Sequence, residues 1–326
     1  MKVGFNMPQL TPYSSQNAVR EFAIRCDKLG YDSLWVQDHF LYPENPNQSH
    51  PVHQFALGPD KIVQWPDAYE DMLAPLEALA YVAGCTENVR LGTSILVFGY
   101  HRPVTLAKQV ATIDQLSGGR FDLGLGLGWS TEEFAHMDTP FEKRGARCTD
   151  FLRALRAAWQ DNPTEYEGPY YNIPKGSTSP KPVQKDWNGN PGVPITGAFL
   201  ADAGFDRVAE LCDSWHPAGH PPDLAMMRLA QINQIAADKY GRAPMKCKLR
   251  VFAAPQLPGI PEIGDQLMQP SWSGTADDMM PHLKAVKEAG CEEVVIDCSF
   301  MAEMRSEEDW ISQPDFFLPL LEEAKS

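Results

Sequence analysis

The sequence predicts an α/β fold in which eight parallel strands and the helices between them close into a (β/α)8 TIM barrel. Segments with the apolar character of buried strands alternate with segments of helical apolar spacing from residue 2 to residue 324. The turns between them are mostly short, as expected for successive β-α-β units. At 326 residues, 43% of them hydrophobic, the chain has the size of one such barrel.

The first β-α-β unit is complete before residue 40. Residues 2–7 form a short apolar run that Pro8 breaks, which is typical of a first strand. Residues 17–29 repeat apolar side chains at helical spacing, and Gly30 follows at the position of a helix C-cap. Residues 32–37, with an apolar centre, then form the second strand.

The remaining units follow the same alternation, with glycines at several helix ends. Further strands are predicted at 89–97, 120–127, 193–197, 213–216, 246–253 and 293–297. Further helices are predicted at 72–83, at 101–117, over most of 129–160, and at 203–211, 223–239, 276–289 and 316–324. The strand 120–127 contains alternating glycines, which leave room for a close-packed barrel interior or for a ligand.

The alternation favours a single domain over residues 1–326, interrupted by an insertion at about 162–192. The inserted segment is rich in Pro, Gly and Tyr, and its residues 165–171 resemble a small hairpin. Residues 40–71 form a long loop rich in Pro, His, Asn and Gln. Such a loop is unusual inside a compact domain unless it covers a site.

Charge and cysteine content exclude several classes of protein. The formal charge of −15 and the pI near 4.9 argue against binding to nucleic acid or an anionic membrane, because phosphate groups require clustered Lys and Arg. The seven cysteines are scattered and form no CxxC pair, which indicates free thiols in a reducing compartment. No apolar run reaches the length of a membrane span, so we expect a cytoplasmic protein.

Asp38 and His39 are the candidate catalytic residues. They follow the second strand directly, and barrel enzymes place their chemistry at the carboxyl ends of their strands. A histidine there can hold or donate a proton near neutral pH, and a neighbouring carboxylate can bias its state. The alternative is a hydrogen-bonded loop pair that caps the next element.

Two further features suggest sites for small ligands. The turn after the fifth strand, which contains Gly197, Ala198 and Phe199, could offer backbone N–H groups to a phosphate, although Gly197 could equally be an ordinary loop glycine. Aromatic residues in the loops either line an apolar substrate pocket or anchor their loops on the core. These aromatic residues are Tyr42, Trp65, Trp129, Phe134, Tyr170 and Tyr171.

Other known motifs fit poorly. The run Gly124–Trp129 (GLGLGW) places its third glycine one residue too early for a dinucleotide-binding fingerprint and lies on the fourth strand. Neither HExxH nor paired cysteines occur, and His50 and His53 lie in a loop, so we expect no metal. A GxSxG elbow is also missing from the sequence, which disfavours a serine hydrolase.

Several stretches together resemble the luciferase-like monooxygenase superfamily, and especially its branch of oxidoreductases that depend on the deazaflavin coenzyme F420. The stretches are LGYDSLWVQDHF (29–40), RLGTSILV (90–97), RPVTLAKQVATIDQLSGGRFDLGLGLGW (102–129), FEKRGAR (141–147), YEGPYY (166–171), PKPVQ (180–184) and DSWHPAG (213–219). They cover much of residues 1–220 in the family's order, whereas the last third matches only in its alternation.

The resemblance implies a bacterial luciferase-like TIM barrel that binds a flavin or deazaflavin at the carboxyl ends of its strands. In the F420 branch an Asp-His pair faces the deazaflavin ring, which corresponds to Asp38 and His39. A non-proline cis peptide on the third strand often supports the ring, which corresponds to the segment Thr93, Ser94 and Ile95. The phosphate region corresponds to Gly197–Phe199. The resemblance also implies a homodimer, because dimers are common in the superfamily.

These observations lead to an expected function with two alternatives. We expect an oxidoreductase that transfers a hydride between F420 and a small, apolar organic substrate, with no metal. Relatives that oxidise sugar phosphates carry a glutamate where this chain has Trp129, which makes a sugar phosphate an unfavourable substrate. Of the loop aromatics, Tyr42 and Trp129 are the candidate residues of the substrate pocket. The alternatives are an FMN-dependent monooxygenase that uses oxygen and a barrel that binds flavin without catalysis.

An acidic cofactor such as F420 requires a basic patch near the barrel mouth, since the chain is strongly acidic overall. Possible contributors are Lys181, Lys185, Arg207 and Arg250. The sequence gives no sign that these four residues converge.

Overall fold

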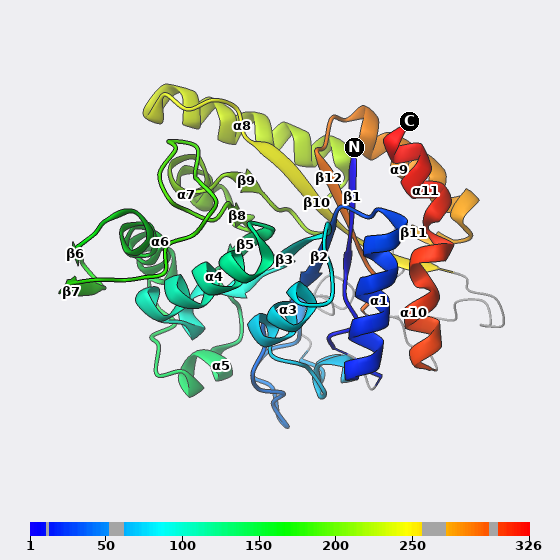
Figure 1. Cartoon of the computed structure of the whole chain (residues 1–326), viewed down its shortest axis with the longest axis horizontal. Coiled ribbons are helices and arrows are strands. Elements are labelled where there is room, and N and C mark those ends of the chain that lie inside the picture. The colour runs from blue at the N-terminus through cyan, green and yellow to red at the C-terminus, as the bar shows by residue number, and fades with distance from the viewer. Residues whose placement is uncertain (11–12, 52–61, 256–271, 300–305) are drawn as a thin grey trace.

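Within the residues that the computed structural model describes, 1–10, 13–51, 62–255, 272–299 and 306–326, eight parallel strands close into a barrel (Figure 1). In order around the barrel they are β1 (Lys2–Asn6), β2 (Ser33–Val36), β3 (Arg90–Thr93), β5 (Phe121–Gly126), β8 (Ile195–Gly197), β9 (Ser214–Trp215), β10 (Lys246–Pro255) and β12 (Glu293–Asp297). The barrel closes because β12 pairs with β1, with Val294 opposite Val3. This confirms the predicted fold class.

Two short strands extend the barrel wall. The strand β4 (Leu96–Val97) pairs with β5 and continues the predicted third strand after a break at residues 94–95. The strand β11 (Trp272–Gly274) pairs with β10. Away from the barrel, β6 (Thr164–Glu167) and β7 (Asn172–Gly176) form an antiparallel hairpin.

The helices lie on the outside of the barrel (Figure 1). They are α1 (Gln16–Leu29), α3 (Pro75–Ala83), α4 (Pro103–Ser117), α5 (Thr131–His136), α6 (Arg144–Gln160), α7 (Phe205–Leu211), α8 (Pro222–Tyr240), α9 (Ala276–Glu288), α10 (Glu307–Phe316) and α11 (Leu318–Lys325). Short 3-10 turns lie at η1 (Asp67–Tyr69), η2 (Phe98–Tyr100) and η3 (Asp202–Gly204). None of the described helices is both long enough and apolar enough to cross a membrane.

Local sequence explains where several helices begin and end. The hydroxyl of Ser15 caps the first turn of α1, and Gly30, with φ 82°, ends it in the left-handed conformation. The predicted long helix over 129–160 is instead two helices, α5 and α6. Lys143 has a positive φ of 54°, and the segment before it contains Pro140, so helical geometry stops there.

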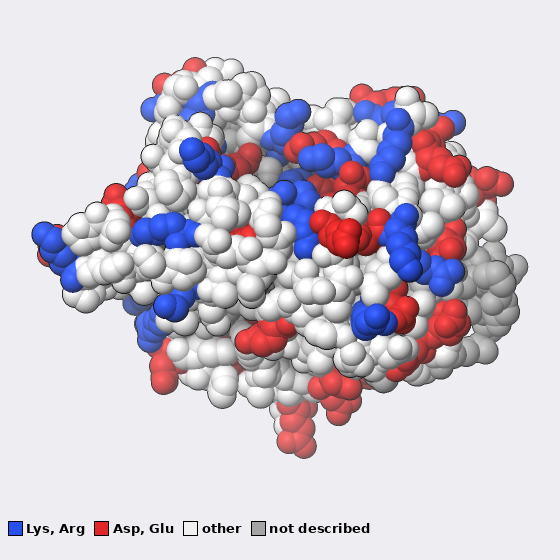
Figure 2. All heavy atoms as spheres, viewed as in Figure 1, with Lys and Arg blue, Asp and Glu red and all other residues white. Residues whose placement is uncertain are grey.

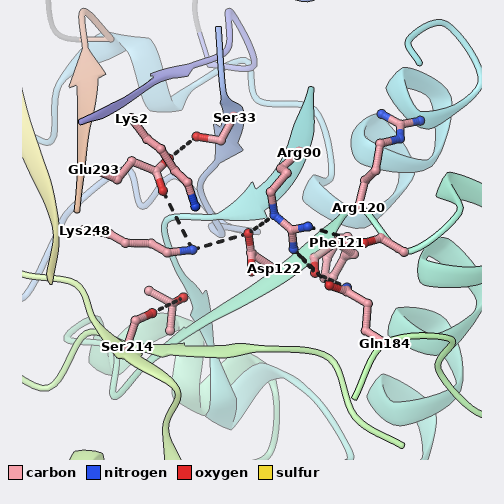
Figure 3. Close-up of polar contacts among 12 residues, drawn as sticks. Lys2, Ser33, Arg90, Arg120, Phe121, Asp122, Gln184, Ser214, Lys248 and Glu293 are labelled. Carbon is pink, nitrogen blue, oxygen red and sulfur yellow. Dashed lines mark hydrogen bonds and ion pairs between the residues drawn. The ribbon is translucent and has the colours of Figure 1, made fainter. Parts of the chain in front are cut away.

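Charged side chains fill the amino-terminal end of the barrel interior (Figure 3). The Nζ atom of Lys248 lies 3.3 Å from Asp122 and 3.8 Å from Glu293, and the Nε atom of Arg90 lies 2.8 Å from Asp122. Burial alone would raise the pKa of Asp122, but Lys248 and Arg90 hold it below its usual value. We call Asp122, Lys248, Glu293 and Arg90 the barrel-floor network. Its charges stabilise one another where water has little access.

Trp35 fills the middle of the barrel above this network, and Gly92 makes room for it. A side chain at Gly92 would collide with the Trp35 indole. Two glycines of the GLGLG run allow the neighbouring segment, residues 93–95, to approach closely. A Cβ at Gly124 would meet the Thr93 carbonyl oxygen, and one at Gly126 would lie 2.6 Å from Ile95. The alternating glycines therefore allow close packing against residues 93–95, as one of the two sequence interpretations proposed.

Candidate functional site

A cavity of about 830 Å³ opens at the carboxyl ends of the strands. Seven of the ten site residues predicted from the sequence line it: Asp38, His39, Ser94, Ile95, Trp129, Ala198 and Phe199. They come from the β3–β4 segment and from the residues that follow β2, β5 and β8. The volume is in the range of cofactor and ligand sites.

The three other predicted residues do not line the cavity and support its walls instead. Thr93 donates its hydroxyl to the Gly124 carbonyl at 2.7 Å. Gly197 packs so closely that a Cβ would lie 2.7 Å from the Cys212 sulfur. The Tyr42 hydroxyl donates to the Trp65 carbonyl at 3.1 Å, outside the cavity, because its loop is anchored on Trp65.

His39 pairs with a residue that the sequence did not assign. Its Nδ1 atom lies 2.7 Å from Oε2 of Glu133, which is fully buried on α5. The other oxygen of Glu133 accepts from the backbone N–H groups of Phe40 at 2.6 Å and Leu41 at 3.2 Å. A signal was present, because Ser130 and Glu133 have the spacing of a capping box. That pattern predicts a local bond at the helix end and gives no hint that the carboxylate reaches β2.

Asp38 has different partners from His39. Its Oδ2 atom accepts from the backbone N–H of Val97 at 2.9 Å and from Nε2 of His101 at 3.0 Å. Its Oδ1 atom is buried and has no hydrogen-bond partner among the described residues. Asp38 therefore pairs with His101 and His39 pairs with Glu133, although Asp38 and His39 are adjacent in the sequence. The hydrogen bond that orients the His39 ring comes from Glu133 rather than from Asp38.

The cavity floor carries a non-proline cis peptide bond between Ser94 and Ile95, within the segment where the resemblance implied one. Below it, Nδ1 of His216 lies 2.6 Å from the Lys248 carbonyl, and Nε2 lies 2.8 Å from the Ser94 hydroxyl. Burial lowers the pKa of His216 to about 3, so the ring is neutral near pH 7. The carbonyl can only accept, hence Nδ1 carries the proton and Ser94 donates to Nε2.

Arg250 links the Ser94–Ile95 segment of the cavity floor to Asp297 at the end of β12. It donates to the Ser94 carbonyl at 2.8 Å and through Nε to Asp297 at 2.9 Å. The guanidinium lines the cavity, yet its charge is balanced by Asp297. It therefore holds the cis segment in place and adds little net positive charge to the cavity.

Two other arginines form a basic corner at the start of α6. Arg144 lines the cavity, and its buried Nε atom has no hydrogen-bond partner among the described residues. Arg207 is 8% exposed and donates to the Gly145 carbonyl at 2.7 Å, but its Nη1 atom has no such partner either. The first turn of α6 has no side-chain cap and no acidic residue. We call Arg144, Arg207 and this first turn the arginine corner.

The arginine corner differs from the basic patch that the sequence suggested. Arg250 lines the cavity and Arg207 lies behind Phe199, with its guanidinium carbon 4.7 Å from the ring centre. Lys181 instead donates to the carbonyls of Ala158 and Asp161, and Lys185 is exposed outside the cavity. The four residues do not converge. Figure 2 shows acidic and basic side chains interspersed on one face of the molecule, without a broad field of one sign.

Aromatic rings enclose His39 on its open side. The ring centroids of Tyr69, Trp65 and Trp129 lie 4.8, 5.5 and 5.6 Å from that of His39. Trp129 also lies 4.6 Å from Trp65 and lines the cavity. Among the described residues, no group of three His, Cys, Asp or Glu side chains is placed to hold a metal. The site therefore offers aromatic surface and hydrogen-bonding groups.

The chain matches the model of one protein family, described as luciferase-like monooxygenase, over residues 3–257. A Mycobacterium tuberculosis protein of undescribed activity is 29% identical over 72% of this chain and 73% of its own. An F420-dependent glucose-6-phosphate dehydrogenase from Amycolatopsis mediterranei is 32% identical over 50% of this chain and 44% of its own. The solved structure of an F420-dependent secondary alcohol dehydrogenase with an F420-acetone adduct superposes with a TM-score of 0.71, at 16% identity, over 98% of each chain.

Proposed function

The chain is an oxidoreductase of the luciferase-like monooxygenase family, and from that premise we propose that it exchanges a hydride between coenzyme F420 and a small, apolar organic substrate. One observation carries the proposal. Asp38, His39 and the Ser94–Ile95 segment meet in one cavity at the carboxyl end of the barrel. The relatives named for F420 dependence support the choice of cofactor.

The polar atoms without partners fit an anionic, ring-bearing cofactor. The arginine corner offers the cavity the Arg144 guanidinium, whose Nε atom has no partner among the described residues, with Arg207 and the uncapped first turn of α6 next to it, which suits a phosphate. At the other side of the cavity, Oδ1 of Asp38 is a buried acceptor that suits a ring N–H or a hydroxyl. When bound, the deazaflavin would supply the hydride chemistry itself.

The protein's own residues would then orient the reactants and move one proton. His39 would donate a proton to the oxygen of the substrate when it is reduced, or accept it when the substrate is oxidised. The aromatic rings of Tyr69 and Trp129 limit access of water to that imidazole. Asp38, held by Val97 and His101, would fix the ring of the cofactor beside His39.

The walls of the cavity favour a neutral, apolar substrate. Trp129 occupies the position at which relatives that oxidise sugar phosphates carry a glutamate, and its indole faces the cavity. Arg250 is neutralised by Asp297, and the arginine corner would be used by the cofactor phosphate. No other Lys or Arg among the described residues lines the cavity, so a phosphate on the substrate would lack a counter-charge.

Equilibrium titration with F420 and with FMN tests the proposal. We expect F420 to quench the tryptophan fluorescence of the purified protein with saturation, and FMN to bind at least about tenfold more weakly. Tight FMN binding without F420 binding would instead favour the FMN-dependent monooxygenase, which the family description supports as the second candidate. Binding without turnover over a broad set of alcohols and ketones would favour a non-catalytic flavin-binding barrel.

A further inference from the structure

We propose that Glu133 is a positioning residue, which keeps a proton on Nδ1 of His39 and thereby makes Nε2 the atom that exchanges a proton with the substrate. The inference rests on the proposed function for the identity of the reaction, but the position of the proton on His39 can be measured without any cofactor. Glu133 lies on α5, 94 residues from His39 in the sequence.

Every direction around the Glu133 carboxylate is used. Oε1 accepts from the backbone N–H groups of Phe40 and Leu41, and Oε2 accepts from the Tyr100 hydroxyl at 2.8 Å and contacts His39 at 2.7 Å. Burial alone would raise the pKa of Glu133. The hydrogen bonds from His39 and the other donors, together with the charge of His39, lower it by more, so the pKa lies below its usual value. The group is therefore an ionised carboxylate.

An ionised carboxylate has no proton to give, so the hydrogen bond to His39 must use a proton on Nδ1. A neutral imidazole carries only one N–H, and its remaining nitrogen, Nε2, then keeps a lone pair. His39 lines the cavity and its side chain is 11% exposed. Rotation of the imidazole would break its hydrogen bond to Glu133, and the nearby rings of Tyr69 and Trp129 leave little room for it. The geometry thus fixes both the tautomer and the orientation.

The neighbouring pair of Asp38 and His101 shows what Glu133 does not do. Asp38 keeps one buried oxygen without a partner and lines the cavity, so it can contact a ligand directly. Glu133 has both oxygens occupied, is fully buried and does not line the cavity. It can act on a ligand only through His39. Among the residues that the structure describes, the titratable groups with contacts to the His39 ring are Glu133, His50 and Tyr69.

The variant Glu133→Gln tests this role with little change in shape. Its amide oxygen can still accept from Phe40 and Leu41, which turns the NH2 group towards Nδ1 of His39. Because the NH2 group can only donate, His39 must move its proton to Nε2. In histidine-labelled protein at pH 8, we expect the nitrogen NMR signals of His39 to show N–H at Nδ1 in the wild type and at Nε2 in Glu133→Gln.

Turnover provides the second readout. With F420 saturating, we expect kcat to fall by about a hundredfold or more in Glu133→Gln, while KM and the Kd of F420 change by less than about threefold, because only the proton-transfer step is affected. The matched control is Tyr100→Phe, which removes one donor from the same carboxylate and leaves Nδ1 its acceptor. Its His39 tautomer and kcat should stay close to those of the wild type.

Two results would overturn the proposal. One is a wild-type spectrum with the proton on Nε2 of His39, which decides the question even if Glu133→Gln does not fold. The other is a Glu133→Gln variant with the switched tautomer and unchanged kcat. If no alcohol or ketone is turned over with F420, the proposed function fails, while the wild-type and variant spectra still show whether Glu133 sets the tautomer.

Discussion

Both ends of the barrel interior are polar, but charged groups are paired with one another at one end, whereas several polar atoms lack partners at the other. At the amino-terminal end, the barrel-floor network pairs Asp122 with Lys248 and Arg90 at 3.3 and 2.8 Å. At the carboxyl end, polar atoms of Asp38, Arg144 and Arg207 are buried without partners among the described residues. Between them lies Trp35, stacked on His216 with ring centroids 5.2 Å apart.

The difference separates stability from function within one barrel. A buried charge with its partner stabilises the fold when the alternative is the same charge alone. A buried polar atom without a partner costs about 1–3 kcal/mol, and a fold keeps it only where something else gains from it. The three atoms at the carboxyl end surround one cavity or lie directly behind its wall, as Arg207 does behind Phe199. A ligand that satisfies them would recover part of that free energy.

The largest effect is expected from Asp122→Asn. This change leaves Lys248 without its nearest carboxylate, and breaking a buried ion pair typically costs about 3–5 kcal/mol. Urea unfolding should show a loss of that size, with the Kd of F420 in the folded variant unchanged. A large change in cofactor affinity with normal stability would contradict the separation of the two ends.

The opposite result is expected from His39→Ala at the carboxyl end. Loss of the general acid or base should lower turnover by about a hundredfold or more, measured with F420 saturating. The free energy of unfolding should fall by about 0.5–1.5 kcal/mol, less than for Asp122→Asn, because Oε2 of Glu133 loses the His39 hydrogen bond but keeps the Tyr100 hydroxyl as a donor. Near-normal turnover would reject the role of His39.

His216 stacks on Trp35 between the two ends of the barrel interior, and its burial should make the free energy of unfolding depend on pH. Its folded pKa of about 3 is below the unfolded value of 6.5, so the unfolded chain binds more protons as the pH falls below 6.5. Stability from this residue is complete above pH 6.5 and is lost towards pH 3, by about 2 kcal/mol between pH 6.5 and 5. Urea unfolding at several pH values should show a shallower dependence in His216→Gln than in the wild type. Equal slopes would mean that His216 is accessible to protons in the folded state.

Arg144→Ala should weaken cofactor binding at the arginine corner. Loss of a charge-assisted hydrogen bond corresponds to about 1.5–3 kcal/mol, or roughly a tenfold to hundredfold increase in Kd. Lys185→Ala is the matched control, since Lys185 is exposed and outside the cavity. Equal Kd values for the two variants would show that the phosphate binds elsewhere.

The smallest effect is expected from Lys2→Met. Lys2 pairs with Glu292 at 3.2 Å close to the barrel-floor network, but its side chain is 47% exposed. Exposed ion pairs contribute about 0–1 kcal/mol, so unfolding in urea should differ by less than that from the wild type. A loss comparable to that of Asp122→Asn would mean that the network extends to the surface.

The sequence predicted the barrel well because its strands are marked locally. Apolar runs and glycine or proline punctuation do not depend on distant residues, and Asp38 and His39, which follow β2 directly, line the cavity. Glu133 could not be assigned in the same way. Its role depends on how α5 lies against the residues after β2, which is a tertiary property that a capping-box pattern does not encode.

The arginine corner was predicted only in part, since Arg207 but not Arg144 was among the possible basic contributors, and the reason is related. Arg144 and Arg207 lie 63 positions apart, and the packing of α6 against α7 brings Arg207 to the carbonyl of Gly145, the residue after Arg144. The sequence motif FEKRGAR had drawn attention to Arg144 only as part of the family resemblance. The overall charge of −15 gives no indication of where individual arginines gather, so it could not locate this corner either.

The glycines of β5 also determine how the site could be redesigned. Since Gly124 and Gly126 touch the backbone or side chains of residues 93–95, a larger residue at either position would displace the cavity floor. Libraries aimed at new substrates should therefore leave β5 unchanged and vary Trp129, Leu200 and Leu224, which line the cavity without entering the hydrogen bonds of its floor. In directed evolution, the floor would act as a fixed template and this wall as the adjustable part.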